Sequence, residues 1–423
     1  MSGVEQPRWI VVLGGHELNA GFAEYAAAHG AKVAVVDWNE SPVYAGDRHL
    51  RLDIKDTESV LQALNDLTAG DLPGKVFLAY TSSDVATETV AQINAGIGLL
   101  RCPPQPLGLA RDKGLMNAVW EAKGLLGKRY VVTSAFDDFA ARLAAWNGPA
   151  IVKPADSASS RGISILETPR SATDLPAIWQ RAAEASLAGD VVIEDFVHGT
   201  EFTAEMIGDG EGHVEVWGIS RKYHTQANAR NRVATKLHYN PSDVPRARQE
   251  RMAAFAAECY RSLGLQYALG HFEFLEKPDG GLVPVEMAAR SNGFIATHLL
   301  AALVGRPGAY LDRYRGVLSG TRVADGLIQA ERSAMYFFYD PPLGSWTRNG
   351  ASILEYLPPG IRSLAHLRSR LISGRDVRMI DSDAERLGFE ILEGAPSDLT
   401  AAAVFAAEAR LYRDCVAAAA VPA

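Results

Sequence analysis

The sequence predicts a protein of mixed α/β and α+β domains that begins with an open parallel sheet. Up to about residue 104, apolar runs typical of buried strands (WIVVLGG, AKVAVVDWN, KVFLAY) alternate with helix-like segments (NAGFAEYAAAHG, ESVLQALNDLTAG, ATETVAQINAGIG). From about residue 130, strand patterns with shorter connections dominate. The chain has 423 residues, which is enough for roughly two to four domains with cores of their own.

Changes in the sequence pattern divide the rest of the chain into regions. Prolines in CPPQP (102–106) indicate a boundary, and LARDKGLMNAVWEAKG reads as a helix. YVVTS, PAIVKP, ISILE and DVVIED read as strands, with a helix near 172–188. Residues 200–222 alternate like antiparallel strands, and a helix is expected near 244–263. We therefore expect an N-terminal α/β domain at 1–104, a central domain at 105–327 with a subdomain at about 115–192, and a small C-terminal lid domain at 328–423.

The composition restricts the partners and the compartment. Lys and Arg number 42 against 50 Asp and Glu, a net charge of −8, and no long basic run occurs. This argues against nucleic acid or an acidic membrane surface as the main partner. The three cysteines lack metal-binding spacing, and we find neither a signal peptide nor an apolar run of roughly 18 residues. We expect a cytoplasmic protein.

Two glutamates in apolar runs are the most informative feature. LGHFEFLE and GLVPVEMA flank KPDGG, and Asp-Gly between such runs predicts a β-hairpin. A turn centred between Asp279 and Gly280 places Glu273 directly opposite Glu286, with Cβ atoms about 5 Å apart. The opposite face would carry Phe272, Phe274, Val285 and Met287. Facing carboxylates need a proton or a cation between them, and Mg²⁺ commonly uses one or two carboxylates plus phosphates. The alternative is a solvated sheet face on which basic side chains pair with the glutamates.

A second group of residues suits phosphate. Lys153 ends an apolar strand, and a loop of small residues from Ala155 to Gly162 follows, whose backbone N–H groups could approach phosphate oxygens. A hairpin with a flexible tip is the alternative. Lys113 is expected on an exposed helical turn. In VVIEDFVHGTEF, Glu194 ends a strand and Glu201 follows, where carboxylates can accept hydrogen bonds from ribose hydroxyls.

Taken in order, DKGLM, IVKPADSASSRG, VVIEDFVHGTEFT, GHFEF and VPVEMAARSNG resemble the ATP-grasp superfamily over about residues 105–325. The flanking regions resemble those of its L-amino-acid ligase branch, which joins a carboxylate to an amine. The resemblance implies a central ATP-grasp domain and ATP-dependent formation of an amide or peptide bond through an acyl-phosphate, with release of ADP and phosphate.

The resemblance also implies site residues and cofactors. ATP would be bound by Lys113, Lys153, Ser157, Ser159, Ser160, Gly162, Glu194, Asp195, Phe196, Val197 and Glu201. Glu273 and Glu286 would ligate Mg²⁺, or Mn²⁺ in its place, and Arg290 and Lys153 would act in catalysis. Ser159 stands where the loop often has glycine. Ala288 stands where many relatives have an asparagine for a second metal, so a second site depends on Asn292.

The expected partners are a small-molecule carboxylate and an amine. Substrate contacts are expected from Gly14 and Gly15 in the first turn. The polar stretch 221–239, read as a loop facing the ligand, would add Arg221, Lys222, His224, Arg230 and Arg232. Homodimers are common among the relatives, and the sequence identifies neither the substrates nor an interface.

Three other functions stay open. VVLGGHELNAGF followed by Asp37 has some features of a dinucleotide-binding oxidoreductase, but its glycines do not form GxGxxG. A second possibility is an ATP-binding module without turnover, against which Lys153, Glu273, Glu286 and Arg290 argue. The third is an enzyme of the same superfamily whose substrate is carrier-bound or whose nucleophile is not an amino acid.

Overall fold

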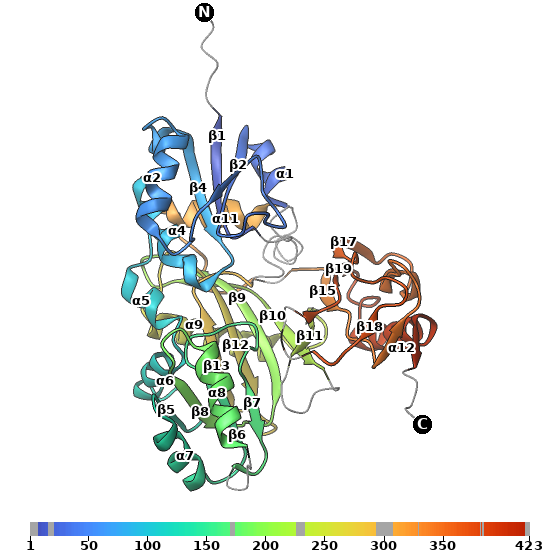
Figure 1. The fold of residues 1–423 in the computed structure, drawn as a ribbon. Helices are drawn as coiled ribbons and strands as arrows, with labels where there is room; N and C mark the ends of the chain where they lie inside the picture. Colours follow the sequence, from blue (N-terminus) through green and yellow to red (C-terminus); the bar gives the residue numbers. More distant parts are fainter. Residues whose placement is uncertain are drawn as a thin grey trace, which may run out of the picture.

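The computed structural model describes residues 7–15, 21–169, 174–225, 233–292, 308–328, 330–380, 382 and 385–418. Figure 1 shows the N-terminal unit above a large central sheet, a small lower unit beneath it, and the C-terminal region to one side.

The N-terminal unit is built on a parallel sheet, as predicted. Its strands lie in the order β3 (Arg48–Arg51), β2 (Ala31–Asp37), β1 (Arg8–Leu13) and β4 (Val76–Thr81). One face packs against α2 (Thr57–Leu67) and α4 (Thr87–Gly96), and the other against α1 (Gly21–Ala28) and α11 (Ala309–Leu318). The short α3 (Leu72–Lys75) and η2 (Asp84–Ala86) precede and follow β4. Because α11 lies more than 200 residues from this sheet in sequence, the local pattern did not predict that it would cover it.

The lower unit carries the predicted phosphate loop. Helices α5 (Pro104–Leu109) and α6 (Lys113–Ala122) lead into a sheet ordered β5 (Tyr130–Thr133), β8 (Val191–Asp195), β6 (Ala150–Pro154) and β7 (Ser164–Leu166). All three strand pairs are antiparallel. Helices α7 (Phe136–Ala145) and α8 (Leu175–Ala185) bury their apolar residues against it.

The central sheet supplies most of the candidate site. Along its path lie β13 (Leu282–Ala288), β12 (Ala268–Glu276), β9 (Thr200–Gly208), β10 (Val214–His224), β11 (Ala234–Tyr239), β15 (Ser333–Phe338), β19 (Phe389–Gly394) and β17 (Arg362–Leu367), and β14 (Gly326–Leu327) pairs with β10. Apolar residues of one face pack against α9 (Arg246–Ser262). Polar residues of the opposite face are therefore available to line a site.

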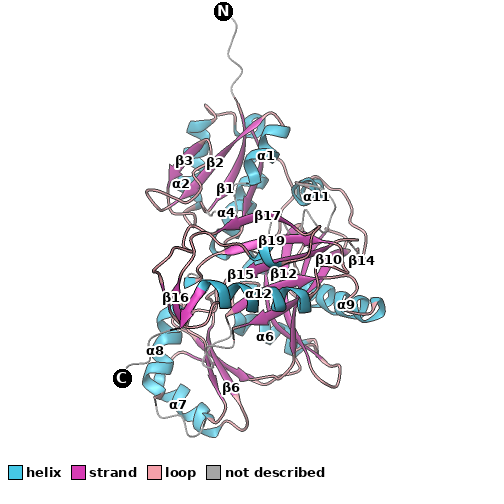
Figure 2. Cartoon of the chain, turned by 90° about the vertical axis from the view of Figure 1, so that its right-hand side faces the viewer, coloured by secondary structure: helices cyan, strands magenta, loops and turns pink. Residues whose placement is uncertain are grey.

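The C-terminal region shares the central sheet. Strands β15, β19 and β17 extend it, so the sheet continues across the expected boundary near residue 327. A separate sheet of β18 (Asp376–Val377), β16 (Gly344–Trp346) and β20 (Val416–Ala418) lies with η4 (Ile353–Tyr356) and α12 (Ala401–Cys415) at the outer end. Figure 2 shows α12 and β16 in front of the central sheet. The domain limits themselves remain a prediction.

One predicted loop is wrong in part. Residues 221–224 end β10 and residues 234–239 form β11, because the two segments pair as antiparallel strands. Residues 226–232 lie outside the described part of the chain.

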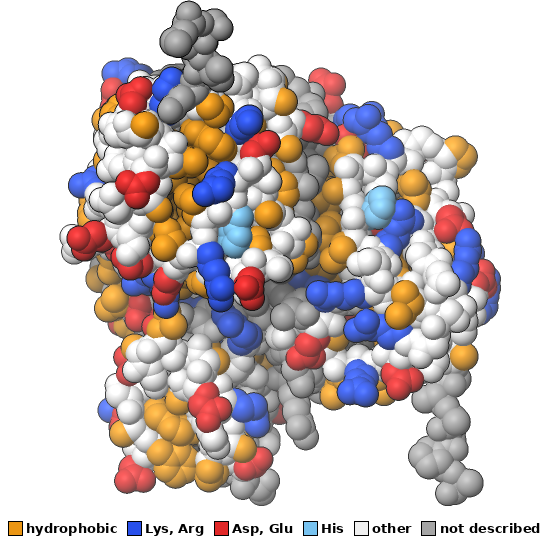
Figure 3. Space-filling model, turned by 45° about the horizontal axis from the view of Figure 1, so that its top comes forward, with side chains coloured by type: hydrophobic (Ala, Val, Ile, Leu, Met, Phe, Trp, Pro, Cys, Tyr) orange, Lys and Arg blue, Asp and Glu red, His pale blue; other side chains and the backbone are white. Residues whose placement is uncertain are grey.

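The visible surface carries charges of both signs. On the face shown in Figure 3, basic side chains are interspersed with acidic ones. Within the described ranges, no helix is both long and apolar enough to cross a membrane.

Candidate active site

A cavity of about 730 Å³ brings the three regions together. Gly14, Gly15 and Asp84 line it from the N-terminal unit, and Phe338 and Arg386 from the C-terminal region. The central part contributes basic and acidic side chains: Lys113, Lys128, Lys153, Glu194, Glu201, Lys222, Glu273, Glu286 and Arg290. Charged groups of both signs thus line one concave space.

The predicted glutamate pair is present. Glu273 of β12 lies directly opposite Glu286 of β13, and both line the cavity. Phe272 and Met287 are buried on the other face, as expected. Val285 was expected there too, which is wrong: the register shifts between Glu273 and Phe274, so Val285 is an extra residue and lines the cavity.

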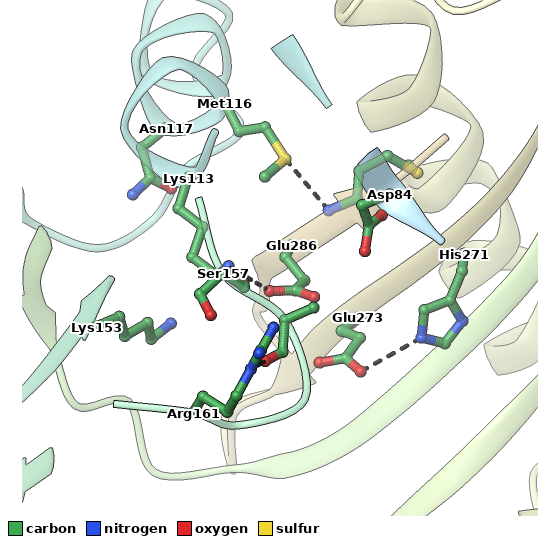
Figure 4. Close-up of polar contacts among 12 residues, drawn as sticks. Asp84, Lys113, Met116, Asn117, Lys153, Ser157, Arg161, His271, Glu273 and Glu286 are labelled. Carbon is green, nitrogen blue, oxygen red and sulfur yellow. Dashed lines mark hydrogen bonds and ion pairs between the residues drawn. The ribbon is translucent and has the colours of Figure 1, made fainter. Parts of the chain in front are cut away.

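Lysines and a histidine neutralise this pair. Nζ of Lys222 lies 2.7 Å from Glu273 Oε1, and His271 Nε2 lies 3.3 Å from the same oxygen. Nζ of Lys113 lies 3.0 Å from Glu286 Oε2 (Figure 4). Burial opposes ionisation of Glu273, but Lys222 and His271 outweigh it and hold the pKa of this carboxyl below its usual range. Glu273 is therefore an anionic group held by cations, and Glu286 lies against the ammonium group of Lys113.

Lys113 and Lys153 both reach this cavity. Lys113 opens α6, its backbone N–H donates to Ala155 O, and its Nζ donates to Ser157 O over 2.6 Å. The side chain is buried, unlike the exposed position expected from the sequence. Burial opposes the charge of Lys113, but Glu286 outweighs it and raises the pKa of the ammonium. Lys153 ends β6, as predicted.

Glu194 has protein partners for both carboxylate oxygens. Its Oε2 accepts from Lys153 Nζ over 2.7 Å and from Lys128 Nζ over 2.8 Å, and its Oε1 accepts from Asn117 Nδ2 over 2.9 Å. Burial raises the pKa of Glu194, yet the two ammonium groups outweigh burial and lower it overall. Lys128 was not predicted, because beside Arg129 in LLGKRYVV it reads as part of a solvated basic pair.

The loop after Lys153 has the backbone of a tight turn. Ser159, Ser160 and Gly162 have φ angles of 63°, 57° and 71°, in the left-handed region that favours glycine. A Cβ on Gly162 would lie 2.7 Å from Arg181 O, so only glycine fits there without a shift. Ser157, Ser159 and Ser160 line the cavity. The two serines therefore hold strained backbone beside the lysines.

Several groups of the segment expected to meet the base are bonded within the protein. Asp195 binds Arg129 through its side chain, and the Phe196 N–H donates to Pro149 O over 3.0 Å. Val197 lines the cavity next to them. Glu201 lies 2.8 Å from Lys222 Nζ and 3.1 Å from His224 Nε2. Burial opposes its charge, but Lys222 and His224 hold the pKa of Glu201 well below the usual value.

Residues of the N-terminal unit bind the segment that follows Glu286. Arg290 Nη2 donates to Asp84 Oδ2 over 2.7 Å, and Tyr80 hydrogen-bonds to Ser291 Oγ. The Asn292 N–H donates to Glu205 Oε2 over 3.2 Å. Asp84 was not predicted, because nothing in the local sequence TSSDVA links it to a residue 206 positions away. Arg290 thus enters the cavity as half of an interdomain ion pair.

The Asp37 carboxylate accepts hydrogen bonds from the first glycine-rich turn and from Asn39. The Gly15 N–H donates to Asp37 Oδ2 over 2.6 Å, and the Asn39 N–H donates to Oδ1 over 2.7 Å. A Cβ on Gly15 would lie 2.3 Å from Pro42 Cβ, so the turn requires glycine. The carboxylate that a dinucleotide-binding enzyme would offer to a ribose is therefore occupied, which weakens that alternative.

Only some of the residues expected to contact substrate line the cavity. Gly14, Gly15, Lys222 and His224 line the cavity. Arg221 does not: successive side chains of β10 alternate in direction, and its guanidinium lies 5.0 Å from the ring centroid of Tyr223. Arg230 and Arg232 fall outside the described residues.

The donor set suits a hard divalent ion bound together with phosphates. Among the described residues, no group of three or more His, Cys, Asp or Glu side chains could hold a metal on its own. Glu273 and Glu286 face each other, and Asn292 lies near His271 at the same end of the sheet. Two carboxylates that need further oxygen ligands are what a Mg²⁺ site shared with a nucleotide requires.

Comparisons with known proteins agree with this geometry. Residues 146–298 match the model of the ATP-grasp domain, a range that includes Lys153, Glu194, Glu273, Glu286 and Arg290. The chain is 32% identical over 184 residues to a D-alanine–D-alanine ligase of Ralstonia nicotianae, an alignment that covers 42% of this chain and 54% of that relative. The match thus spans just over half of the relative's length.

Two solved structures have similar folds. The L-amino acid ligase from Bacillus licheniformis superposes with a TM-score of 0.72 at 14% identity, over 98% of this chain and 100% of that one. The biotin carboxylase domain of the Hydrogenobacter thermophilus 2-oxoglutarate carboxylase, in complex with Mg-ADP, superposes with a TM-score of 0.66 at 14% identity, over 92% and 86%. The predicted fold class and the resemblance are confirmed: residues 146–298 match the ATP-grasp domain, and the fold of the chain is similar to that of the L-amino acid ligase.

Proposed function

We propose that this protein is an ATP-dependent carboxylate–amine ligase, which forms an amide or peptide bond through an acyl-phosphate and releases ADP and phosphate. One observation carries the proposal. Glu273 and Glu286 face each other in a cavity that also holds the ammonium groups of Lys113 and Lys153 and the guanidinium of Arg290. Anionic and cationic groups in this arrangement suit a metal–triphosphate complex and the transfer of its terminal phosphoryl group.

The nucleotide would lie between the small sheet and the central sheet. Lys113 and Lys153 would bind phosphate oxygens, and the loop with Ser157, Ser159, Ser160 and Gly162 would cover them. Val197 would offer backbone groups to the base, and Glu201 would accept hydrogen bonds from the ribose. The Asp195 carboxylate and the Phe196 N–H are bonded within the protein, so the base would not contact these two groups.

Glu273 and Glu286 would hold Mg²⁺, with Mn²⁺ as a substitute. When bound, the ion supplies positive charge to the phosphate oxygens. Lys222 stays within reach of Glu201 when Glu273 turns to a metal, since its Nζ contacts both carboxylates. Asn292 is the remaining candidate for a second ion, and its N–H bond to Glu205 holds its backbone in place.

The chemistry requires two displacements. A substrate carboxylate oxygen bonds to the γ-phosphorus as the bond to the bridging oxygen of ADP breaks. An amine nitrogen then bonds to the acyl carbon, phosphate leaves, and the amine loses a proton. Arg290 and Lys153 would stabilise the charge on the phosphoryl group during transfer. Because acyl-phosphates hydrolyse, the loop above Lys153 and the C-terminal wall with Phe338 and Arg386 would exclude water.

The substrates would be small molecules. Three parts of the chain line the cavity, and its N-terminal lining includes Gly14, Gly15 and Asp84, which binds Arg290. We propose a cytoplasmic location, which fits three buried free cysteines, Cys102, Cys259 and Cys415. A homodimer remains a prediction.

The test is release of ADP and phosphate from Mg-ATP with pooled carboxylates and amines, with the product mass measured. Release that needs both substrates, together with a mass equal to their sum minus water, supports the ligase and identifies its substrates. Release with a carboxylate but no new amide, or ATP binding without any release, contradicts it. Arg290→Lys is the comparison variant. Lysine keeps the positive charge but lacks the second guanidinium nitrogen, with which Arg290 binds Asp84.

A further inference from the structure

Three side chains meet at the buried carboxylate of Glu194. Lys153 and Lys128 both donate to Oε2, over 2.7 and 2.8 Å, and Asn117 donates to Oε1. The side chains of Lys128, Lys153 and Glu194 are only 3%, 6% and 1% exposed. We call these four residues the Glu194 cluster. Lys128, Lys153 and Glu194 line the cavity, and Asn117 stands behind them on α6.

The charges of the cluster do not cancel. Two ammonium groups face one carboxylate, and the amide of Asn117 adds no charge. Glu286, the next acid to influence Lys128, already pairs with Lys113. A buried positive charge without a counter-ion is unfavourable, so the cluster favours an anion in the adjacent cavity.

The excess charge depends on Lys128. Without it, Lys153 and Glu194 would form a neutral buried pair, and moving Lys153 to a phosphate would leave Glu194 buried and unpaired. With it, Glu194 keeps an ammonium partner when Lys153 turns away. We propose that Lys128 is a positioning residue that holds Glu194 and thereby frees Lys153 for the nucleotide phosphates. This inference rests on the proposed nucleotide-binding function.

The proposal also predicts a dependence of binding on pH. Burial lowers the pKa of Lys128 to about 8, with Glu194 opposing and Lys153 adding to this effect. The groups that face Lys128 are Glu194 and Lys153, with Glu286 further away. Because the nucleotide favours the protonated form, its affinity should be greatest below pH 8 and should fall by up to about tenfold per pH unit above it.

The experiment measures the dissociation constant of a fluorescent N-methylanthraniloyl ATP between pH 7 and 9.5. Lys128→Met removes the charge at similar length, and Lys128→Arg keeps it at every pH in this range. Lys123→Met, at the exposed end of α6, is the matched control. Thermal unfolding of each variant shows that it folds.

Three expected results support the proposal, and two other results would overturn it. At pH 7, Lys128→Met should bind the nucleotide on the order of 10- to 100-fold more weakly, the effect of losing a hydrogen bond to a charged group. Lys128→Arg should bind as the parent does at pH 7 and lose the decline above pH 8, and Lys123→Met should behave as the parent throughout. If Lys128→Met has the affinity and pH dependence of the parent protein, the inference about Lys128 is overturned and the proposed function is not. Failure of the parent protein to bind the nucleotide would overturn the proposed function and the inference with it.

Discussion

Lys222 provides a sharp test of the charges around the glutamate pair. Its Nζ lies 2.8 Å from Glu201 Oε1 and 2.7 Å from Glu273 Oε1, and its side chain is 12% exposed. Burial opposes the charge, but the two carboxylates outweigh it and raise the pKa of Lys222 far above its usual value. Lys222→Met keeps the length of the side chain and removes the ammonium, so Glu201 and Glu273 lose their shared counter-ion.

The expected loss of stability follows from the contacts that remain. Removing one partner of a buried ion pair costs about 3–5 kcal/mol. Glu201 keeps His224 at 3.1 Å and Glu273 keeps His271 at 3.3 Å, which places the loss near the lower end. A loss of about 3 kcal/mol lowers the melting temperature of a cooperative unit of 150–250 residues by roughly 6–12 °C.

Magnesium should restore part of this stability. The variant leaves Glu273 without its competing ammonium, so Mg²⁺ should bind the glutamate pair more tightly than in the parent protein. Mg²⁺ at about 100 times its dissociation constant adds about 2.7 kcal/mol. Calorimetric melting with and without Mg²⁺, in the absence of nucleotide, measures both effects.

The matched control is Lys236→Met. Lys236 is also buried and lies 2.9 Å from Glu408, but it does not line the cavity. Lys236→Met should be less stable than the parent protein, and Mg²⁺ should not restore its stability. The reasoning is refuted if Lys222→Met has the same melting temperature as the parent protein, or if Mg²⁺ raises the melting temperatures of Lys222→Met and Lys236→Met equally.

Three further outcomes are expected. Glu286→Ala should keep the fold but lose Mg-ATP-dependent phosphate release by roughly a thousandfold, since a metal supplies several kcal/mol of charge stabilisation; parent-like release would remove Glu286 from the metal site. Asp84→Asn should lower kcat by about 10- to 100-fold with a smaller change in KM for ATP, because Arg290 loses its orienting partner; Asp84→Glu should restore part of the rate, and an effect on KM alone would contradict this role. The pKa of Glu194 is lowered in the folded protein, so its contribution is complete above its unfolded value of 4.5 and is lost progressively as the pH falls from that value toward the lower folded pKa. The difference in melting temperature between the parent and Glu194→Gln should therefore begin to shrink as the pH falls below about 4.5, and a difference that widens there would contradict the sign.

Short-range patterns predicted much of the fold and part of the site. The Asp279–Gly280 turn predicted the hairpin and the pairing of Glu273 with Glu286, but the register beside the turn differs by one residue: Glu276 pairs with Leu282, and the bulge at Val285 brings Glu286 opposite Glu273. The same pattern could not reveal the bulge that moves Val285 into the cavity. Period-two alternation explains why Lys222 reaches the cavity and Arg221 does not, once residues 221–224 are known to continue β10.

Long-range contacts account for what the sequence did not predict. The strands after residue 327 join the central sheet, and a strand pattern does not specify its partner strand. Asp84 acquires its role only when the N-terminal unit meets Arg290. Lys128 and Arg129 are neighbours in sequence, yet one turns into the cavity and the other outward to Asp195. Burial of a lysine is a property of the assembled fold.

The acyl-phosphate is the central claim, and oxygen transfer tests it most directly. Once the pooled assay has identified a carboxylate substrate, that substrate is labelled with ¹⁸O in its carboxyl group and turned over with unlabelled Mg-ATP and the amine. The proposed reaction transfers one ¹⁸O atom from each carboxylate to the released phosphate, which mass spectrometry detects. Unlabelled phosphate, or label in AMP, would show that the carboxylate does not attack the γ-phosphorus and would contradict the account.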